Sequence, residues 1–206
     1  MSVDGLPVII LVDDDISVLR SLQRLFSLAG YAVREFAGPT EVLAEHPFDG
    51  EGCIVTDLRM PDKSGLEFQR EALAKGWTLP FVFISGHGEL RDAVQAMKAG
   101  ASDFLEKPLA PQVLLQAVDR ALASNRKGRQ QRQIEREAHD RIDRLSPREK
   151  DVCKLVAKGM LNKQIAARLG TSEKTVKAQR GSAMKKLEAR STADLLKLLS
   201  SAGLDW

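Results

Sequence analysis

The stretch VIILVDDDISV (residues 8–18) joins an apolar run to three consecutive aspartates. The run predicts a buried strand, and the 3.6-residue apolar period that starts at Ile16 predicts a helix directly after it. Asp is favoured just before the first turn of a helix, so we expect Asp15 to be the N-cap. Asp13 and Asp14 need a different reason, because adjacent carboxylates at the end of a buried strand repel each other. A bound cation is one such reason.

Four more apolar runs follow within the first 124 residues, and amphipathic helical patterns separate them. Strands that are apolar throughout and alternate with helices are typical of a parallel sheet covered on both faces. Glycine just after a helical pattern, as at Gly30, Gly76 and Gly100, favours a left-handed C-terminal cap. We predict an open, doubly wound, five-stranded α/β domain of the flavodoxin-like kind. Its strands are expected at 7–12, 32–36, 53–57, 80–85 and 103–107, and its helices at 16–29, 39–46, 64–75, 89–99 and 111–124.

The composition, 43% hydrophobic and 29% charged, is that of an ordinary globular protein. No apolar stretch has the roughly 18 residues that a membrane span needs. The start, MSVDGLPVIILVDDD, lacks the basic region and the small-residue cleavage site of a signal peptide. Cys53 and Cys153 stand far apart without a CxxC partner, so we expect reduced core thiols. These features predict a cytoplasmic protein with no membrane partner.

The net charge of +3 conceals a division of the chain. Residues 1–124 carry 11 Lys and Arg against 18 Asp and Glu, a net charge of −7. The remaining residues carry 20 against 10, a net charge of +10. An acidic half followed by a basic half indicates two domains, of which the second faces a polyanion. Solvated lysine-rich helices would give the same sign, so the charge alone does not identify the partner.

A polar linker connects the two halves, and we predict a first domain at 1–124, the linker at 125–144 and a second domain at 145–206. We expect the second part of the linker to be helical and Gly128 to interrupt the helix. Its apolar stripe suits pairing with a second copy or docking on its own chain. The stripe consists of Ile134, Ala138, Ile142 and Leu145.

Residues 145–206 show four helical patterns and no strand pattern. The first begins with SPRE (146–149), in which the serine is the expected N-cap, the proline the first helical residue and the glutamate the capping-box partner. The patterns at 162–169 and 172–187 are joined by the turn GTS (170–172). Two short helices joined by such a turn are typical of a helix-turn-helix. We predict an all-α, four-helix domain.

Functional sites of open parallel sheets form beyond the carboxyl ends of the strands. Clustered carboxylates there suit a hard divalent ion, and magnesium takes one or two of them together with water and phosphate oxygens. A carboxylate can also attack phosphorus to form an aspartyl-phosphate. The ion, a lysine and a hydroxyl would then stabilise the phosphoryl oxygens, so magnesium is the predicted cofactor. The side chains expected at this edge are Asp13, Asp14, Asp57, Ser85 and Lys107.

Four segments of the first half resemble, in order and spacing, the receiver domain of two-component response regulators. They are LVDDD (11–15), VTDLRMPDKSGLE (55–67), FISGHGE (83–89) and AMKAGASDFLEKP (96–108). The resemblance implies that Asp57 is the phosphoacceptor of a sensor histidine kinase. It implies that magnesium is held by Asp13, Asp14, Asp57 and the backbone carbonyl of Arg59.

The same resemblance implies that Ser85, Lys107 and Phe104 form the phosphate-contacting switch. It also implies that the peptide bond before Pro108 is cis. Leu109 stands where the family often has an aromatic residue, which affects the details of the dimer face and leaves the chemistry intact.

The individual roles have simpler structural alternatives. Asp57 could be a turn carboxylate, Ser85 a strand-end hydroxyl and Phe104 an ordinary core aromatic. His87 lies close to the predicted site, where it would modulate hydrolysis or be a solvated loop residue.

The basic half resembles the four-helix LuxR/NarL-type output domain over residues 145–196. The most diagnostic parts are LSPRE (145–149), NKQIAARLGTSEKTVK (162–177) and KKL (185–187). A helix-turn-helix lays its second helix in the major groove of DNA, where Lys and Arg serve phosphates or guanine edges. The residues expected at DNA are Lys174, Thr175, Lys177, Ala178, Arg180, Gly181 and Lys185. The alternative is a small helical bundle that binds protein.

Both domains in this order resemble the FixJ-like subgroup, so we expect a transcription regulator and not a dedicated enzyme. The implied partners are a sensor histidine kinase, double-stranded DNA with a two-fold operator, RNA polymerase and, after phosphorylation, a second copy of the chain. By analogy we expect activation of transcription.

Three rival functions differ in one feature each. A phosphatase or mutase of the haloacid-dehalogenase kind wants a second carboxylate two residues after its nucleophile, where Arg59 stands. A constitutive DNA-binding protein with a vestigial receiver would not need the full acidic set. An RNA-binding antiterminator would lack the glycine turn at Gly170.

Overall fold

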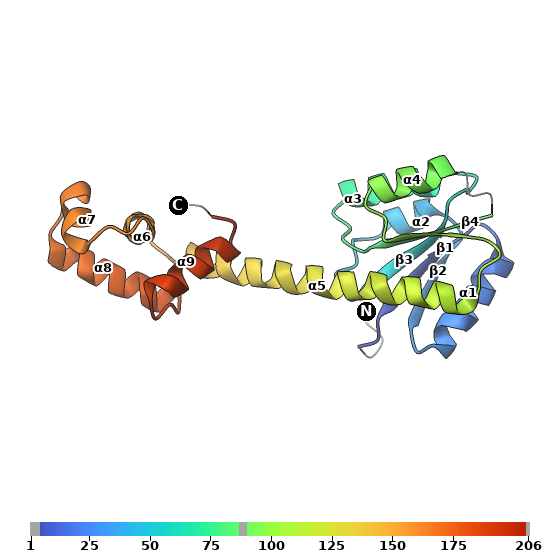
Figure 1. The fold of residues 1–206 in the computed structure, drawn as a ribbon, viewed down its shortest axis with the longest axis horizontal. Helices are drawn as coiled ribbons and strands as arrows, with labels where there is room; N and C mark the ends of the chain where they lie inside the picture. Colours follow the sequence, from blue (N-terminus) through green and yellow to red (C-terminus); the bar gives the residue numbers. More distant parts are fainter. Residues whose placement is uncertain (1–4, 87–89, 205–206) are drawn as a thin grey trace. The chain divides into compact units, whose positions relative to one another are not determined.

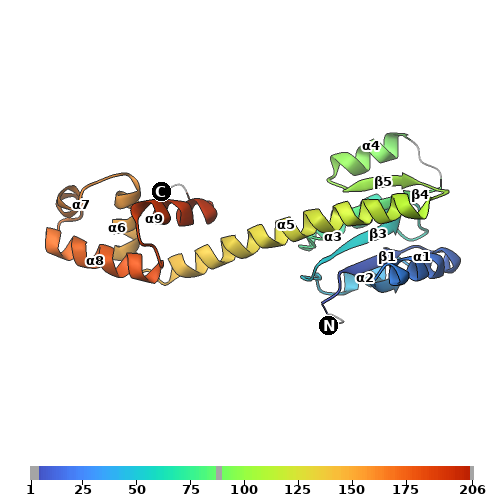
Figure 2. The same ribbon diagram turned by 60° about the horizontal axis from the view of Figure 1, so that its bottom comes forward.

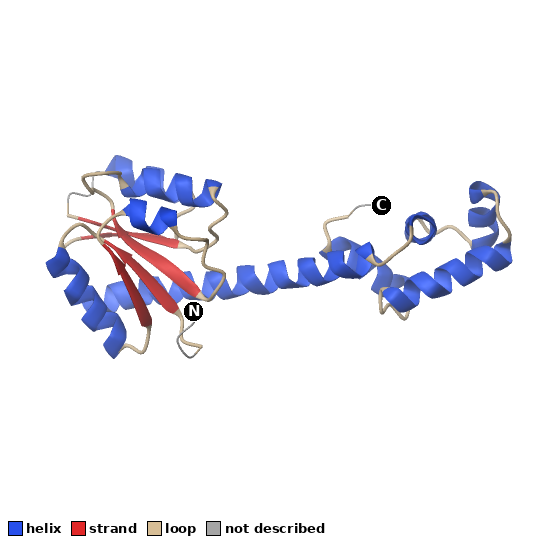
Figure 3. Ribbon diagram, turned by 180° about the vertical axis from the view of Figure 1, so that it is seen from behind, coloured by secondary structure: helices blue, strands red, loops and turns tan. Residues whose placement is uncertain are grey.

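The computed structural model describes residues 5–86 and 90–204. The chain divides into two compact units, residues 1–129 and residues 130–206 (Figure 1). The first unit contains a β-sheet with helices on both faces, and the second is helical (Figure 3). Each unit is therefore described separately.

Five parallel strands form the sheet of the first unit, each within one residue of its predicted range: β1 (Val8–Val12), β2 (Ala32–Phe36), β3 (Gly52–Asp57), β4 (Phe81–Ser85) and β5 (Asp103–Glu106). Their order in the sheet is β2-β1-β3-β4-β5. β3 pairs with β1 on one side and with β4 on the other. The carboxyl ends of these three strands therefore lie side by side at one edge of the sheet.

Helices cover the sheet on both faces (Figure 2). They are α1 (Ile16–Leu28), α2 (Pro39–Ala44), α3 (Gly65–Ala74), α4 (Leu90–Lys98) and α5 (Pro111–Asp143). α1 and the first part of α5 pack on one face, and α2, α3 and α4 pack on the other. The predicted doubly wound α/β architecture is confirmed, and Gly30, Gly76 and Gly100 have the positive φ angles expected after helices.

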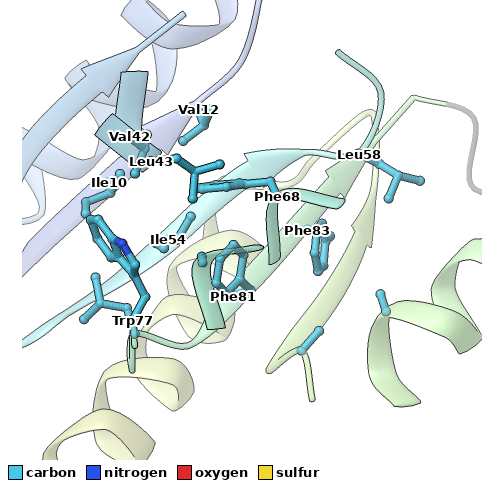
Figure 4. Packing of buried hydrophobic residues seen from close by; sticks show 14 of the residues in the cluster. Ile10, Val12, Val42, Leu43, Ile54, Leu58, Phe68, Trp77, Phe81 and Phe83 are labelled. Carbon is cyan, nitrogen blue, oxygen red and sulfur yellow. The ribbon is translucent and has the colours of Figure 1, made fainter. Parts of the chain in front are cut away.

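Successive side chains of each strand enter opposite cores, because the side chains of a strand alternate. Ile9 and Leu11 of β1 belong to the core under α1 and α5, whereas Ile10 and Val12 belong to the core under α2, α3 and α4. In the second core the ring of Phe68 meets that of Phe81 edge to face, with centroids 5.2 Å apart (Figure 4). Burial on both faces explains why these strands are apolar throughout.

Helix α5 corrects one prediction. It runs without interruption from Pro111 to Asp143, so the expected break at Gly128 is wrong. A glycine in a helix interior costs about 1 kcal/mol relative to alanine, and the strong helix formers Arg, Lys and Gln around it offset that cost. Beyond Gly128, the side chains of Ala138, Ile142 and Leu145 are buried in the core of the second unit. Three of the four residues of the apolar stripe thus dock on their own chain, whereas Ile134 is 42% exposed.

Four further helices form the second unit: α6 (Pro147–Ala157), α7 (Asn162–Leu169), α8 (Glu173–Lys186) and α9 (Thr192–Ser201). Ser146 caps α6 in a capping box with Glu149, as predicted. α7 ends at Gly170, whose φ of 63° is left-handed, and Ser172 caps α8 two residues later. This short turn joins α7 to α8 in the predicted helix-turn-helix.

Two predictions from composition can be compared with the described residues. Cys53 and Cys153 are both buried free thiols. Within residues 5–86 and 90–204, the search for an apolar helix long enough to cross a membrane found none.

Candidate functional site

The carboxyl edge of the sheet brings together residues that are far apart in the chain. Asp57 is the last residue of β3 and Ser85 the last of β4, while Asp13 directly follows β1. Lys107 directly follows β5, and its backbone N–H donates to the Ser85 carbonyl at 2.8 Å. The sheet order therefore places Asp13, Asp57, Ser85 and Lys107 at one edge, as the strand-end rule predicts.

Lys107 connects the two carboxylates of this edge. Its Nζ donates to Asp57 Oδ2 at 2.8 Å and to Asp13 Oδ2 at 3.2 Å. The peptide bond between Lys107 and Pro108 is cis, as the resemblance implied. The two carboxylates, which would otherwise repel each other, thus share one ammonium group.

Burial shapes the protonation of this cluster. Asp13 is only 3% exposed, and its burial raises the pKa of the carboxyl even though the Asp15 N–H and the Lys107 ammonium favour the ionised form. Burial would also lower the pKa of Lys107, but the hydrogen bond to Asp57 and the charges of Asp13 and Asp57 outweigh it and raise that pKa. Lys107 is therefore a cation at physiological pH.

The loop after Asp57 folds back over the end of β3. Asp57 Oδ1 accepts a hydrogen bond from the Arg59 N–H at 3.1 Å, and Gly65 N–H donates to the Leu58 carbonyl at 2.8 Å. A Cβ atom on Gly65 would lie 2.5 Å from the Asp57 carbonyl oxygen, so only glycine permits this approach. The side chain of Asp57 is 14% exposed and remains accessible at the edge.

The remaining predicted site residues of the first unit differ in how far their side chains are exposed and in what they contact. Asp14 is exposed, whereas Ser85 is 1% exposed. Phe104 is half-buried and packs against the core under α4, so the structure is compatible with both interpretations of this aromatic. Arg59 extends toward Asp92 of α4, with an N–O distance of 3.9 Å. His87 lies outside the described residues.

Asp15 is the helix N-cap that the opening motif predicts. Its Oδ1 accepts from Ser17 N at 2.7 Å and from Ser17 Oγ at 2.6 Å. These hydrogen bonds lower the pKa of Asp15. Asp15 N–H in turn donates to Asp13 Oδ1 at 2.9 Å, which fixes the orientation of the Asp13 carboxylate.

The donor atoms of the edge fit a magnesium ion better than a softer or larger metal. Asp13 and Asp57 supply two carboxylates, and the cation that hydrogen-bonds to both is the Lys107 ammonium. The atoms that these two side chains offer to a metal ion are all oxygens. In the part of the chain that the structure describes, Asp14 does not join Asp13 and Asp57 in a group of three side chains that could hold a metal ion. Magnesium needs only one or two protein carboxylates, whereas zinc and calcium sites use more protein ligands.

The second unit presents the predicted DNA-binding residues on α8. Six of the seven are exposed: Lys174, Thr175, Lys177, Ala178, Gly181 and Lys185. The seventh, Arg180, is only partly exposed and hydrogen-bonds within the unit to Asn162 and Thr192.

Glu149 has a role beyond the predicted capping box. It is 6% exposed, and its carboxylate accepts from Ser146 N–H, Ser182 Oγ and Lys186 Nζ at 2.7, 2.6 and 2.7 Å. These hydrogen bonds, first of all that of Lys186, lower the pKa of Glu149 to about 2. Ser182 and Lys186 lie four residues apart and so share one face of α8, which is the sequence signal that could have indicated the contact.

Comparison with known families agrees with both units. Residues 9–119 match the response regulator receiver domain. Residues 143–199 match the bacterial regulatory proteins of the luxR family.

Similar full-length proteins and structures contain both units. Nodulation protein W of Bradyrhizobium diazoefficiens is 44% identical over 96% of this chain and 87% of that protein. The transcriptional regulatory protein FixJ of Azorhizobium caulinodans is 39% identical over 98% of this chain and 95% of its own length. The structure of the response regulator StyR has 41% identity and a TM-score of 0.85 over 95% of this chain and 98% of StyR. The chain belongs to the two-component response regulators that join a receiver domain to a LuxR-type, DNA-binding output domain and regulate transcription.

Proposed function

We propose that Asp57 accepts a phosphoryl group from the phosphohistidine of a sensor histidine kinase. The observation that best supports this is the pairing of Lys107 Nζ with Asp57 Oδ2 at 2.8 Å, which places a cation beside an accessible carboxylate. A carboxylate oxygen of Asp57 attacks phosphorus and an O–P bond forms. The bond from phosphorus to the histidine nitrogen breaks, and its electron pair returns to the imidazole. The protein acts as a regulator in this step and not as a dedicated enzyme.

Magnesium bound by Asp13, Asp14, Asp57 and the backbone carbonyl of Arg59 would supply positive charge to the phosphoryl oxygens. The chain itself contributes the Lys107 ammonium, which is already held at the site by Asp13 and Asp57. Asp13 is oriented for this role by the N–H of Asp15.

Phosphorylation then acts as the switch. The group adds about −1.5 to −2 charge and three acceptor oxygens, which Ser85 and Lys107 bind. The Lys107 backbone N–H donates to the Ser85 carbonyl, which links the ends of β5 and β4. Both strand ends therefore respond to the phosphoryl group together. Phe104 on β5 changes position with them, as a two-state element biased by the phosphate.

The altered face lies on α4, β5 and the first part of α5, and it carries receiver dimerisation. Val94 and Met97 of α4 and Val113 of α5 are 44%, 48% and 46% exposed, which supports an interface here. To reverse a 1:99 equilibrium, phosphorylation, dimerisation and DNA binding together must favour the active state by about 5.5 kcal/mol.

In the dimer, two output domains bind the two halves of a two-fold operator. The exposed residues of α8 from Lys174 to Lys185 contact DNA, and the complex activates transcription through RNA polymerase in the cytoplasm. Lys and Arg at phosphates make such binding strongly dependent on salt.

The test is analytical ultracentrifugation of the full chain with magnesium, with and without beryllofluoride as a phosphoryl analogue. Wild type, Asp57→Ala and the control Asp62→Ala, which removes an exposed carboxylate of the same loop, are compared. We expect beryllofluoride to dimerise wild type and Asp62→Ala but not Asp57→Ala. A wild type that keeps one oligomeric state, or an Asp57→Ala variant that dimerises equally well, would contradict the proposal.

A further inference from the structure

Helix α8, the second helix of the helix-turn-helix, has a buried face and an exposed face, and the spacing of its residues in the sequence distinguishes the two. Consecutive residues of an α-helix are rotated by about 100°, so residues three, four, seven and eleven apart share a face. Val176, Ala183 and Leu187 follow this spacing and are each 0% exposed. Arg180 stands four residues after Val176 and three before Ala183, and it therefore belongs to this inward face.

The exposed face opposite these residues follows a different register. Lys174, Ala178, Gly181 and Lys185 share the opposite face, and all four are exposed. Arg180 is rotated away from these four residues by about 100° or more, while the exposed Lys177, three residues before Arg180, lies between the two faces. Its residue type predicts a DNA contact, whereas its position on the helix does not.

The guanidinium of Arg180 links α8 to residues of α7 and α9. Nη1 donates to Asn162 Oδ1 at 3.2 Å, and Nη2 donates to Thr192 Oγ1 at 3.1 Å. Asn162 is the first residue of α7 and Thr192 the first residue of α9. One side chain thus ties the starts of both helices to the middle of the recognition helix.

We propose that Arg180 is a positioning residue for DNA recognition: it fixes α8 against α7 and α9 and makes no contact with DNA. Its planar guanidinium is suited to this task because the two arms donate in different directions at the same time. A lysine keeps the charge but has one compact ammonium, so it cannot replace the two arms in this geometry. This inference rests on the DNA binding of the family and is independent of phosphorylation at Asp57.

Mutations of the two acceptors separate a positioning role from a contact with DNA. Asn162→Ala combined with Thr192→Val removes both acceptors of Arg180 and leaves every charge of the protein in place. If Arg180 positions α8, this double variant weakens DNA binding as a change at Arg180 does. If Arg180 contacts DNA, the double variant leaves its charge free for the phosphate.

The experiment uses the full-length chain with magnesium and beryllofluoride. The probe is a fluorescent duplex that the wild type has selected from a random-sequence library. Binding is measured by anisotropy over a series of KCl concentrations for wild type, Arg180→Lys, Arg180→Ala, Asn162→Ala/Thr192→Val and the combination of Arg180→Lys with the double variant. Lys185→Ala serves as the control for loss of a cation on the exposed face.

We expect Arg180→Lys and the double variant each to weaken binding about 10-fold, and the triple variant to be no weaker than either, because all remove the same interaction. The slope of log K against log salt should stay at the wild-type value in all three, while Lys185→Ala lowers it by about 1. The constant slope shows that no contact between a cation and a phosphate is lost, and the folded fraction is verified separately.

Two results would overturn the proposal. One is wild-type affinity in the double variant. The other is wild-type affinity in Arg180→Lys together with a slope that falls by about 1 in Arg180→Ala, which marks a phosphate contact. Circular dichroism verifies that each variant is folded, and if Arg180→Lys is not, the double variant decides alone.

Discussion

Lys107 Nζ lies 2.8 Å from Asp57 Oδ2, although fifty residues separate them in the chain. The contact exists because β5 and β3 both end at the same edge of the sheet, one strand apart. Asp13 shares the same ammonium at 3.2 Å. Two carboxylates therefore share one positive charge.

Lys107→Met removes this charge while keeping a side chain of similar length. Without magnesium we expect the free energy of unfolding of the receiver to fall by about 1–3 kcal/mol, because Asp13 and Asp57 then lack a counter-charge. About 10 mM magnesium should restore most of the loss, since an ion that binds only the folded state stabilises it. Urea denaturation followed by the fluorescence of the buried Trp77 measures both values. Equal stability of variant and wild type without magnesium would contradict this account.

Asp13→Asn is expected to have the opposite effect. The pKa of Asp13 is raised in the folded state above its ordinary value of 3.8, chiefly by burial, so the ionised carboxylate disfavours folding as the pH rises. Without magnesium at pH 7 we expect the variant to be more stable than wild type. The difference should disappear below about pH 4, where Asp13 is protonated in both states. Magnesium should stabilise wild type and not the variant. Denaturation curves at several pH values, with and without magnesium, measure both effects. A stability difference that does not change with pH, or a variant that magnesium stabilises equally, would contradict this account.

Gly65→Ala tests the close approach of α3 to the end of β3. The new Cβ would lie 2.5 Å from the Asp57 carbonyl oxygen and 2.9 Å from the Phe83 ring. We expect a loss of about 1–3 kcal/mol in the free energy of unfolding, as for overpacked cores. Gly38→Ala is the control, because its Cβ would meet no atom closer than 3.9 Å. Thermal unfolding of both variants should show a loss for Gly65→Ala only.

The strands and the phosphoacceptor edge could be predicted from sequence because two local rules sufficed. Runs such as PVIILV are apolar throughout only when both faces of a strand are buried, and parallel strands collect their ends at one edge. Helix α5 shows the limit of such rules. Gly128 is a statistical helix breaker, but its neighbours on both sides favour helix and the residues beyond it dock into a core.

Arg180 and Glu149 show a second limit. The type of a side chain suggests its partner, and an arginine in a recognition helix suggests DNA. In the structure Arg180 binds Asn162 and Thr192, and Glu149 binds Ser182 and Lys186. These contacts depend on how four helices pack. The position of Arg180 relative to Val176 and Ala183 could have been read from the sequence, since helical spacing alone places it on the inward face.

Glu149→Gln should destabilise the output domain in a pH-dependent way. The pKa of Glu149 is depressed to about 2 from an ordinary value of 4.5, so its carboxylate stabilises the fold above pH 4.5 and loses that effect as the pH falls toward 2. At pH 7 we expect the variant to lose about 1.5–3 kcal/mol of its free energy of unfolding, the contribution of a hydrogen bond to a charged group. The difference from wild type should shrink between pH 4.5 and 2. Calorimetry of the full chain at several pH values follows the transition, and a constant difference would show that Lys186 does not depend on the charge of Glu149.

Gly181→Ala separates stability from DNA binding. Gly181 lies inside α8, and a Cβ atom there would meet nothing within 4 Å, so alanine fits the free protein. We expect the free energy of unfolding to rise by about 0.5–1 kcal/mol, because alanine is the better helix former. Gly181 shares the exposed face with Lys174 and Lys185, and we expect the extra methyl group to weaken DNA binding at least several-fold by blocking close approach of the backbone to DNA. Thermal unfolding and anisotropy with the selected duplex measure the two effects on the same samples. A more stable variant with unchanged affinity would remove Gly181 from the DNA-contacting set and leave the other exposed residues of α8 in place.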